Sequence, residues 1–128
     1  MIKKKILNSH RVRSIRGGFS FIPHRFVTDG FLASLSANEL LLYLFLVTVS
    51  DRNGLSFYRS DSICSLLHMT YDHYDKARDR LIEKDLIAFD GTIFQLLDLP
   101  HSPPKKTTVS QHTDLNDLIQ KCVKGVPA

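Results

Sequence analysis

Residues 60–98 read SDSICSLLHMTYDHYDKARDRLIEKDLIAFDGTIFQLLD, and they carry the clearest pattern of secondary structure in the sequence. Its apolar residues first recur at helical spacing and then form two short runs, residues 86–89 and 92–97, on either side of Asp90 and Gly91. An aspartate–glycine pair between two such runs is the strongest short-range signal for a β-hairpin. The stretch therefore predicts a short helix, a tight turn, a longer helix and a hairpin with a two-residue turn.

Both predicted helices begin at residues whose side chains can accept a hydrogen bond from an unpaired backbone amide. Ser60 or Asp61 is expected to cap the first helix, and Thr70 is expected to cap the second, which spans residues 71–84. The inward stripe of the first helix is Ile63, Leu66 and Leu67. The apolar face of the second is Tyr74, Ala77, Leu81 and Ile82.

A further helix is predicted upstream, starting at Ser36 and ending before the turn at Asn53 and Gly54. Ser36 and Glu39 have the spacing of a capping box, in which the serine accepts from one free amide and the glutamate reaches back to another. Residues 40–49 (LLLYLFLVTV) are the most apolar run, far shorter than the roughly 20 residues of a membrane span. We expect this helix to be buried on several sides.

Residues 55–58 (LSFY) are predicted to form a short strand that joins the hairpin in a three-stranded sheet. The predicted fold class is therefore mainly α with a small antiparallel β-sheet. The order of the elements is that of a winged helix-turn-helix, whose second helix is shaped to enter a DNA major groove.

The segment before these elements is rich in aromatic residues. Residues 19–22 alternate between apolar and polar side chains, which predicts a short strand before Pro23. Residues 24–35 predict a short helix that is interrupted or bent near Gly30. The sequence leaves open whether residues 19–31 form a dimer contact or contribute a helix to the core.

The length of 128 residues and an apolar fraction of 43% allow one domain with a modest core. We predict a basic flexible arm at residues 1–18, the winged-helix domain at residues 19–100, and a flexible linker and tail at residues 101–128. Residues 114–123 of the tail have the pattern of one marginal helix. Two cysteines, Cys64 and Cys122, indicate reduced thiols, with a disulfide the less favoured alternative. Because no apolar run of signal-peptide length follows the basic N-terminus, we expect a cytoplasmic protein.

The net charge of +4 conceals a strong asymmetry. Residues 1–28 carry seven Lys or Arg and no acid, which leaves a net charge of −3 on the remainder. A basic arm on a weakly acidic body is a common arrangement for attraction to a phosphate backbone. The alternative is a solubilising tail, and the acidic body alone is expected to bind DNA weakly.

The apolar face of the second helix fixes which of its residues point outward. The candidate DNA contacts lie early in this helix, and they are Thr70, Tyr71, His73, Lys76 and Arg80. Lys76 and Arg80 are the favoured donors to guanine edges or phosphates. The alternative is a structural or protein-facing helix, since Asp75 and Asp79 can pair with Arg78 as a solvated face.

Three arginines of the arm are further candidate DNA contacts: Arg11, Arg13 and Arg16. They resemble the arms that thread into an adjacent minor groove. The alternation from Arg11 to Arg13 also fits an edge strand or a dimer contact. The hairpin turn lacks Lys or Arg, so its function is expected to be architectural.

Patterns typical of catalysis or of bound cofactors are weak in this sequence. His24, His68 and His73 have no metal-ligand spacing with Cys64, and the glycine pair at residues 17 and 18 lacks the features of a phosphate-binding loop. We therefore predict a protein that is not an enzyme, with no cofactor, no metal, no evident small-molecule ligand and no membrane partner.

Five sequence motifs of these elements resemble those of a known family. The motifs are FSFIPHRF at residues 19–26, LSANELLLYLFLV at 35–47, GLSFY at 54–58, SDSICSLLHM at 60–69, and a helix of the form T-x-x-x-Y-x-x-A-x-x-x-L-I-x-x-x-L-I from Thr70. This pattern is similar to the N-terminal winged helix of plasmid replication initiators and of DnaD-like and GntR-like regulators. Asp85 stands where those families usually have glycine, and Arg78 where an apolar residue is commoner.

Residues 8–100 are also similar to small uncharacterised proteins of bacterial mobile elements, which open with an RVR motif and contain a YLFLV helix. These resemblances imply a double-stranded DNA-binding protein, either a transcriptional regulator or an accessory factor of replication or transposition. A homodimer on paired half-sites is expected, because one such module seldom gives enough affinity alone. The alternative function is a winged-helix module that binds proteins and reads no DNA.

Overall fold

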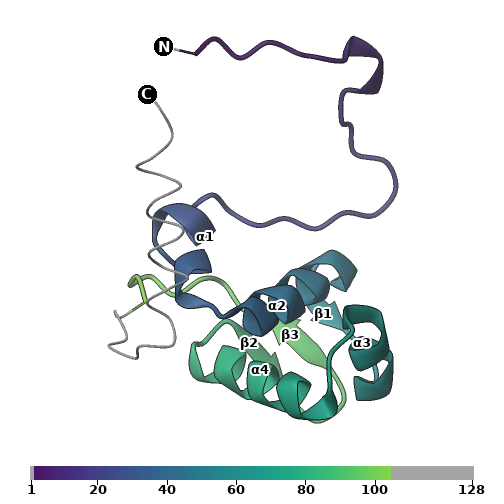
Figure 1. The fold of residues 1–128 in the computed structure, drawn as a ribbon, viewed down its shortest axis with the longest axis vertical. Coiled ribbons are helices and arrows are strands. Elements are labelled where there is room, and N and C mark those ends of the chain that lie inside the picture. The colour runs from purple at the N-terminus through teal and green to yellow at the C-terminus, as the bar shows by residue number, and fades with distance from the viewer. Residues whose placement is uncertain (1, 105–128) are drawn as a thin grey trace.

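The computed structural model describes residues 2–104, which are mainly helical with one small antiparallel sheet (Figure 1). This confirms the predicted class. The α-helices are α1 (Arg25–Thr28), α2 (Ala37–Val49), α3 (Ser60–Leu67) and α4 (Tyr71–Glu83), and the 3-10 helices are η1 (Ser9–Arg11) and η2 (Leu32–Ser34). The strands are β1 (Leu55–Ser56), β2 (Ile87–Phe89) and β3 (Phe94–Leu96). The predicted tail helix and Cys122 lie outside the described residues.

The three strands pair in the order β1-β3-β2, so the predicted three-stranded sheet is present, but its first strand ends at Ser56 and not at residue 58 as predicted. The hairpin is closed by four residues instead of two, because Phe89 and Phe94 are the last paired residues. The Asp90 carboxylate accepts from the backbone N–H of Thr92 (2.8 Å) and Ile93 (2.7 Å), which draws both residues into the loop. Gly91 occupies a left-handed conformation there, with φ of +97°.

The core lies between α2, α4 and the sheet. Buried side chains from these elements include Leu42, Leu46, Tyr74, Leu81 and Phe94. The expectation that α2 is buried on several sides is only partly right, because Leu41 and Leu44 are 42% and 39% exposed. No helix within residues 2–104 is long and apolar enough to cross a membrane.

The aromatic segment at residues 19–31 divides into a buried half and an exposed half. Phe26 and Phe31 are each only 2% exposed, and the Phe26 ring stacks on Tyr43 with 5.0 Å between centroids. The alternative of a core contribution is therefore confirmed for these two residues. Phe19 and Phe21, by contrast, are 65% and 76% exposed. The predicted bend near Gly30 is present, since Gly30 separates α1 from η2 at φ of +85°.

The prediction of a strand at residues 19–22 is wrong. This segment pairs with no strand and instead crosses the end of α2, where the Ser20 hydroxyl lies 3.1 Å from the Ser50 carbonyl oxygen. The edge-strand alternative for Arg11 and Arg13 is also wrong. The Asn8 side chain accepts from the His10 amide (3.0 Å) and closes a turn that takes up Arg11.

The helix starts are as predicted in two cases out of three. Ser36 and Thr70 cap α2 and α4, but α3 begins at Ser60 with Arg59 in the capping position and no side-chain cap. Asp61 instead accepts from the neighbouring Ser62 amide at 2.9 Å. The predicted inward stripe of α3 is wrong at one residue.

The error in α3 concerns Leu66, which is 58% exposed. Cys64 is buried instead, beside Ile63, because α3 packs against α4 through the side that carries those two residues.

Candidate nucleic-acid interface

The turn between α3 and α4 sets the direction of α4. His68 ends α3 in a left-handed conformation (φ of +53°), and the Met69 amide donates back to the Cys64 carbonyl at 3.0 Å. Met69 is buried after this turn, which anchors it to the core. The Thr70 hydroxyl oxygen then accepts from the His73 amide at 3.1 Å and starts α4. The Thr70 oxygen is thus engaged by the helix, while its hydroxyl hydrogen remains able to donate to a ligand.

The residues predicted to point outward from α4 are exposed, but they do not all share one side. Tyr74, Ala77 and Leu81 face the core. His73, Lys76 and Arg80 are exposed and stand three or four residues apart, so they share one side of the helix. Tyr71, 57% exposed, lies toward the other edge of the exposed surface.

Carboxylates offset much of the positive charge on α4. Lys76 Nζ lies 3.2 Å from Asp72 Oδ2 one turn earlier. Arg78 lies 3.3 Å from both Asp75 and Asp79, which confirms the predicted pairing of these side chains.

Arg80 differs from the other cations of α4. Within residues 2–104, it makes no ion pair at 4.0 Å or less. Arg80 is therefore the cation of α4 that is most readily available to a phosphate or a guanine edge.

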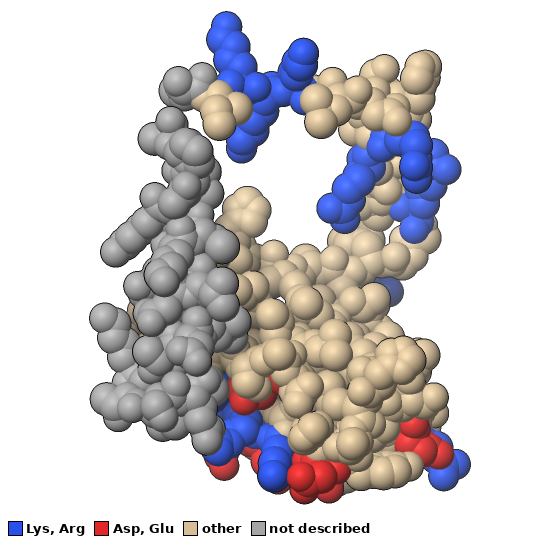
Figure 2. Space-filling model, viewed as in Figure 1, with Lys and Arg blue, Asp and Glu red and all other residues tan. Residues whose placement is uncertain are grey.

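The arginines of the arm lie away from α4. Arg11, Arg13 and Arg16 are exposed, and Figure 2 shows the blue side chains of the arm at the top of the view. A mixture of red and blue lies at the foot of the view, where Figure 1 places α4. Residues 19–104 carry a net charge of −4. The structure therefore separates the arm's positive charge from the more acidic body and does not bring the two predicted sets of contacts together.

The β2–β3 loop carries no cation. Hydrogen bonds from the Ile93 and Thr92 amides hold the pKa of the Asp90 carboxyl below its ordinary value, so Asp90 is ionised at neutral pH. A negative loop does not favour contact with phosphate. That the loop is only architectural stays a prediction.

Sequence reasoning missed the position of Arg78. Its guanidinium lies over the rings of Tyr74 and Phe89, with 5.4 and 5.5 Å to the two centroids, and so joins α4 to β2. The sequence carried one signal, since Arg78 occupies a position where the resembling families favour an apolar residue. A planar guanidinium stacks on aromatic faces, so an arginine can occupy a position that packs against two rings.

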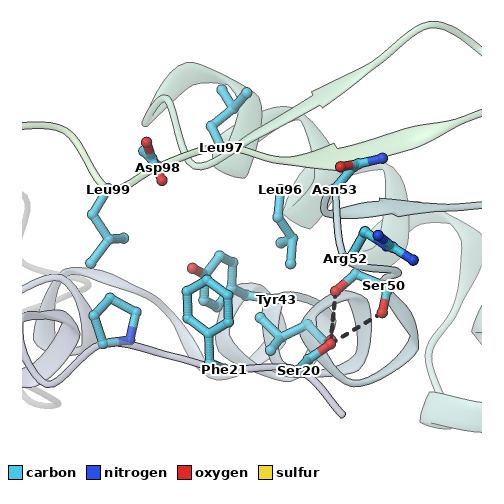
Figure 3. Close-up of a pocket in the computed structure, with 12 residues that line it drawn as sticks. Ser20, Phe21, Tyr43, Ser50, Arg52, Asn53, Leu96, Leu97, Asp98 and Leu99 are labelled. Atoms are coloured by element: carbon cyan, nitrogen blue, oxygen red, sulfur yellow. Dashed lines mark hydrogen bonds between the residues drawn. The ribbon is translucent and has the colours of Figure 1, made fainter. Parts of the chain in front are cut away.

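Ser20 attaches the arm to the body beside a small cavity of about 170 Å³ (Figure 3). The Ser20 and Ser50 hydroxyls are 3.0 Å apart, and the segment with Phe21 lies across the cavity from Leu96 and Leu97. The volume is below the roughly 300–1,000 Å³ of common small-molecule sites. The contact with Ser50 fixes where the arm leaves the domain.

The remaining chemical groups of the domain are its possible metal ligands and one thiol. Residues 2–104 contain no group of three or more His, Cys, Asp or Glu side chains that could hold a metal ion. Cys64 is a buried free thiol, and its burial raises the pKa of that thiol. Comparisons of the chain with protein-family models, curated proteins and solved structures give no match. The functional interpretation therefore rests on the residues and their geometry.

Proposed function

We propose that residues 19–100 form a winged helix-turn-helix that binds double-stranded DNA with α4 in the major groove. The observation that supports this proposal most strongly is the position of α4 in the domain and the set of side chains that it leaves exposed. The helix follows a tight turn after α3, buries one face in the core and leaves His73, Lys76 and Arg80 exposed on one side. The β1-β3-β2 sheet supports the same reading, because a winged helix carries a small sheet of this kind beside its helices.

The arm supplies the nonspecific part of the binding in this proposal. Arg11, Arg13 and Arg16 contact phosphates or the minor groove, while Arg80 and Lys76 meet the major groove. Lys76 must give up its contact with Asp72, but both partners are over 70% exposed, so the pair is weak. The protein acts as a transcriptional regulator or as an accessory factor of replication or transposition, in the form of a dimer on paired half-sites.

A protein-interaction module is the second candidate, and two observations favour it. Residues 71–83 carry four carboxylates against three Lys or Arg, which weakens attraction to phosphate. Leu41 and Leu44 also leave part of α2 apolar and exposed, as at protein-binding surfaces. A protein partner need not release counterions on binding, whereas phosphate neutralisation does. Steep salt dependence therefore separates the two functions.

Alanine variants of α4 test the first candidate on a preferred duplex obtained by selection from random sequence. Arg80→Ala is expected to weaken that site roughly 5- to 150-fold, in line with about 1–3 kcal/mol for one bidentate base contact, and to affect random duplex much less. Lys76→Ala should have the smaller effect because of its pairing with Asp72. Arg52→Ala, an exposed arginine outside α4, serves as the matched control. If Arg80→Ala weakened the affinity for both duplexes equally, α4 would contact only phosphates and would not read bases.

A further inference from the structure

A groove lies on the side of α4 that is opposite to Arg80. It has a volume of about 340 Å³ and runs between α4, the β2–β3 hairpin and the segment that links β1 to α3. Its walls combine four aromatic rings and two guanidinium groups, from Phe57, Tyr58, Tyr74, Phe89, Arg59 and Arg78. Neither Lys76 nor Arg80 lines it. The groove is therefore distinct from the proposed duplex contact on the same helix.

The aromatic residues of this groove differ in how much of each ring is free. Tyr58 packs edge-on against Phe45 at 5.1 Å between centroids, and Phe89 stacks on Phe94 at 4.3 Å. Phe57 is 60% exposed, and no other ring of residues 2–104 stacks on it. Folding leaves one large planar apolar surface uncovered at the edge of a groove whose other rings are already packed.

The two arginines of the groove also differ. Arg78 is held over Tyr74 and Phe89, and Asp75 and Asp79 offset its charge. Arg59 is 76% exposed and makes only a loose contact of 3.6 Å with Asp61. Arg59 follows Phe57 by two residues, in a segment that is neither helix nor strand, and the backbone at Arg59 is extended. In extended backbone, side chains two residues apart lie on the same side. The groove is thus lined by an exposed cation with one weak ion pair and by an exposed aromatic ring.

We propose that this groove binds single-stranded nucleic acid, with a base stacked on Phe57 and its neighbouring phosphate at Arg59. Aromatic rings beside a basic group are the common means of holding unpaired nucleotides, because every base offers a planar face. Bases within a duplex are covered by their neighbours and cannot stack on a protein ring. The groove therefore selects unpaired strands, and this activity does not depend on duplex binding by α4.

The proposal is tested by fluorescence anisotropy with labelled oligothymidylate, oligouridylate and a random duplex, on the full chain at low salt. Phe57→Ala should weaken single-strand binding about 5- to 150-fold, the equivalent of one stacked base, and leave duplex binding unchanged. Leu66→Ala removes a side chain of similar exposure (58%) outside the groove and should change neither. The two single strands distinguish DNA from RNA as the preferred form.

A second measurement uses the absence of tryptophan from the chain. Phe57→Trp keeps an aromatic ring and adds the only tryptophan of the chain, whose emission should be quenched by single strands and not by the duplex. Leu66→Trp should show no quenching. Equal single-strand affinity of Phe57→Ala and the unmodified chain, or no quenching of the Phe57→Trp variant, would overturn this inference. A loss of duplex binding alone would bear only on the proposed function.

Discussion

Glu39 and Lys84 show how one pair of residues joins separate parts of the fold. Lys84 Nζ donates to the Glu39 carboxylate and, at 2.7 Å, to the Ser34 carbonyl, so it connects the end of α4 to the start of α2. The capping-box spacing predicted the contact between Ser36 and Glu39. It did not predict that the carboxylate would accept from the Ser36 hydroxyl (2.7 Å) and from Lys84 instead of from the Ser36 amide. A partner 45 residues away leaves no local signal in the sequence.

Lys84→Met should lower the free energy of unfolding by about 3 kcal/mol, because it leaves the buried Glu39 carboxylate without its cation. Urea unfolding measures the change. Lys84→Arg keeps the charge and should lose much less. The double variant Glu39→Gln with Lys84→Met should recover part of the loss, since no charge is then left unpaired. Equal stability of Lys84→Met and the unmodified protein would contradict this account of the pair.

The same pair predicts a dependence of stability on pH. Burial alone would raise the pKa of the Glu39 carboxyl, but hydrogen bonds from Lys84 and Ser36, together with the Lys84 charge, hold this pKa below its ordinary value of 4.5. The contribution to stability is therefore present above about pH 4.5 and is lost as the pH falls through the lower, folded-state pKa. The stability gap between the unmodified protein and Glu39→Gln should narrow over that interval in urea titrations. If this difference in stability widened as the pH fell, the pKa of Glu39 would be raised by folding and not lowered.

At the scale of single elements, α4 was the most predictable part because its signals are local. Its capping residue, its helical period and the hairpin signal after it all lie within residues 70–97. The cap was as predicted, and so was the apolar face except at Ile82, which is 37% exposed. Errors arose where a neighbour decides the outcome. Leu66 fits the apolar period of α3, yet it is exposed because α4 packs on the side of Ile63 and Cys64.

Thr70→Ala should destabilise the domain by about 1 kcal/mol, because it leaves the His73 amide without its acceptor at the start of α4. Thr70→Ser keeps the hydroxyl and should cost only a small part of that. Thermal unfolding of both variants provides the measurement. If the two variants lose equal stability, the methyl group of Thr70 and not its oxygen would be the stabilising feature.

The end of α4 gives a second prediction at this scale. Asp85 adopts a left-handed conformation (φ of +60°), and the following Leu86 amide donates to the Leu81 carbonyl at 3.1 Å. Glycine adopts this left-handed conformation at less cost than any residue with a Cβ atom. Asp85→Gly should therefore raise the free energy of unfolding by up to about 1 kcal/mol, and Asp85→Val should lower it. A destabilised glycine variant would show that the Asp85 side chain contributes more than its backbone costs.

At the scale of the whole molecule, the basic arm and the acidic body differ in the sign of their net charge. The sequence predicted this asymmetry, since charge is a matter of composition. It could not predict where the arm leaves the domain, because that depends on the contact of Ser20 with Ser50, 30 residues away. Nor could it predict that Phe57 stays exposed while Phe26 and Phe31 are buried. Such differences depend on packing between distant segments.

DNA binding by this protein is tested by its affinity for duplex DNA across a salt series, measured for the full chain and for a form without residues 1–17. The arm carries six Lys or Arg, and each phosphate contact adds about 0.9 to the slope of log affinity against log salt. We expect the affinity of the full chain to fall steeply with salt. Without the arm, the affinity should be weaker and the slope smaller by up to about 5. No binding by either form at low salt would contradict a DNA-binding function and favour the protein-interaction module.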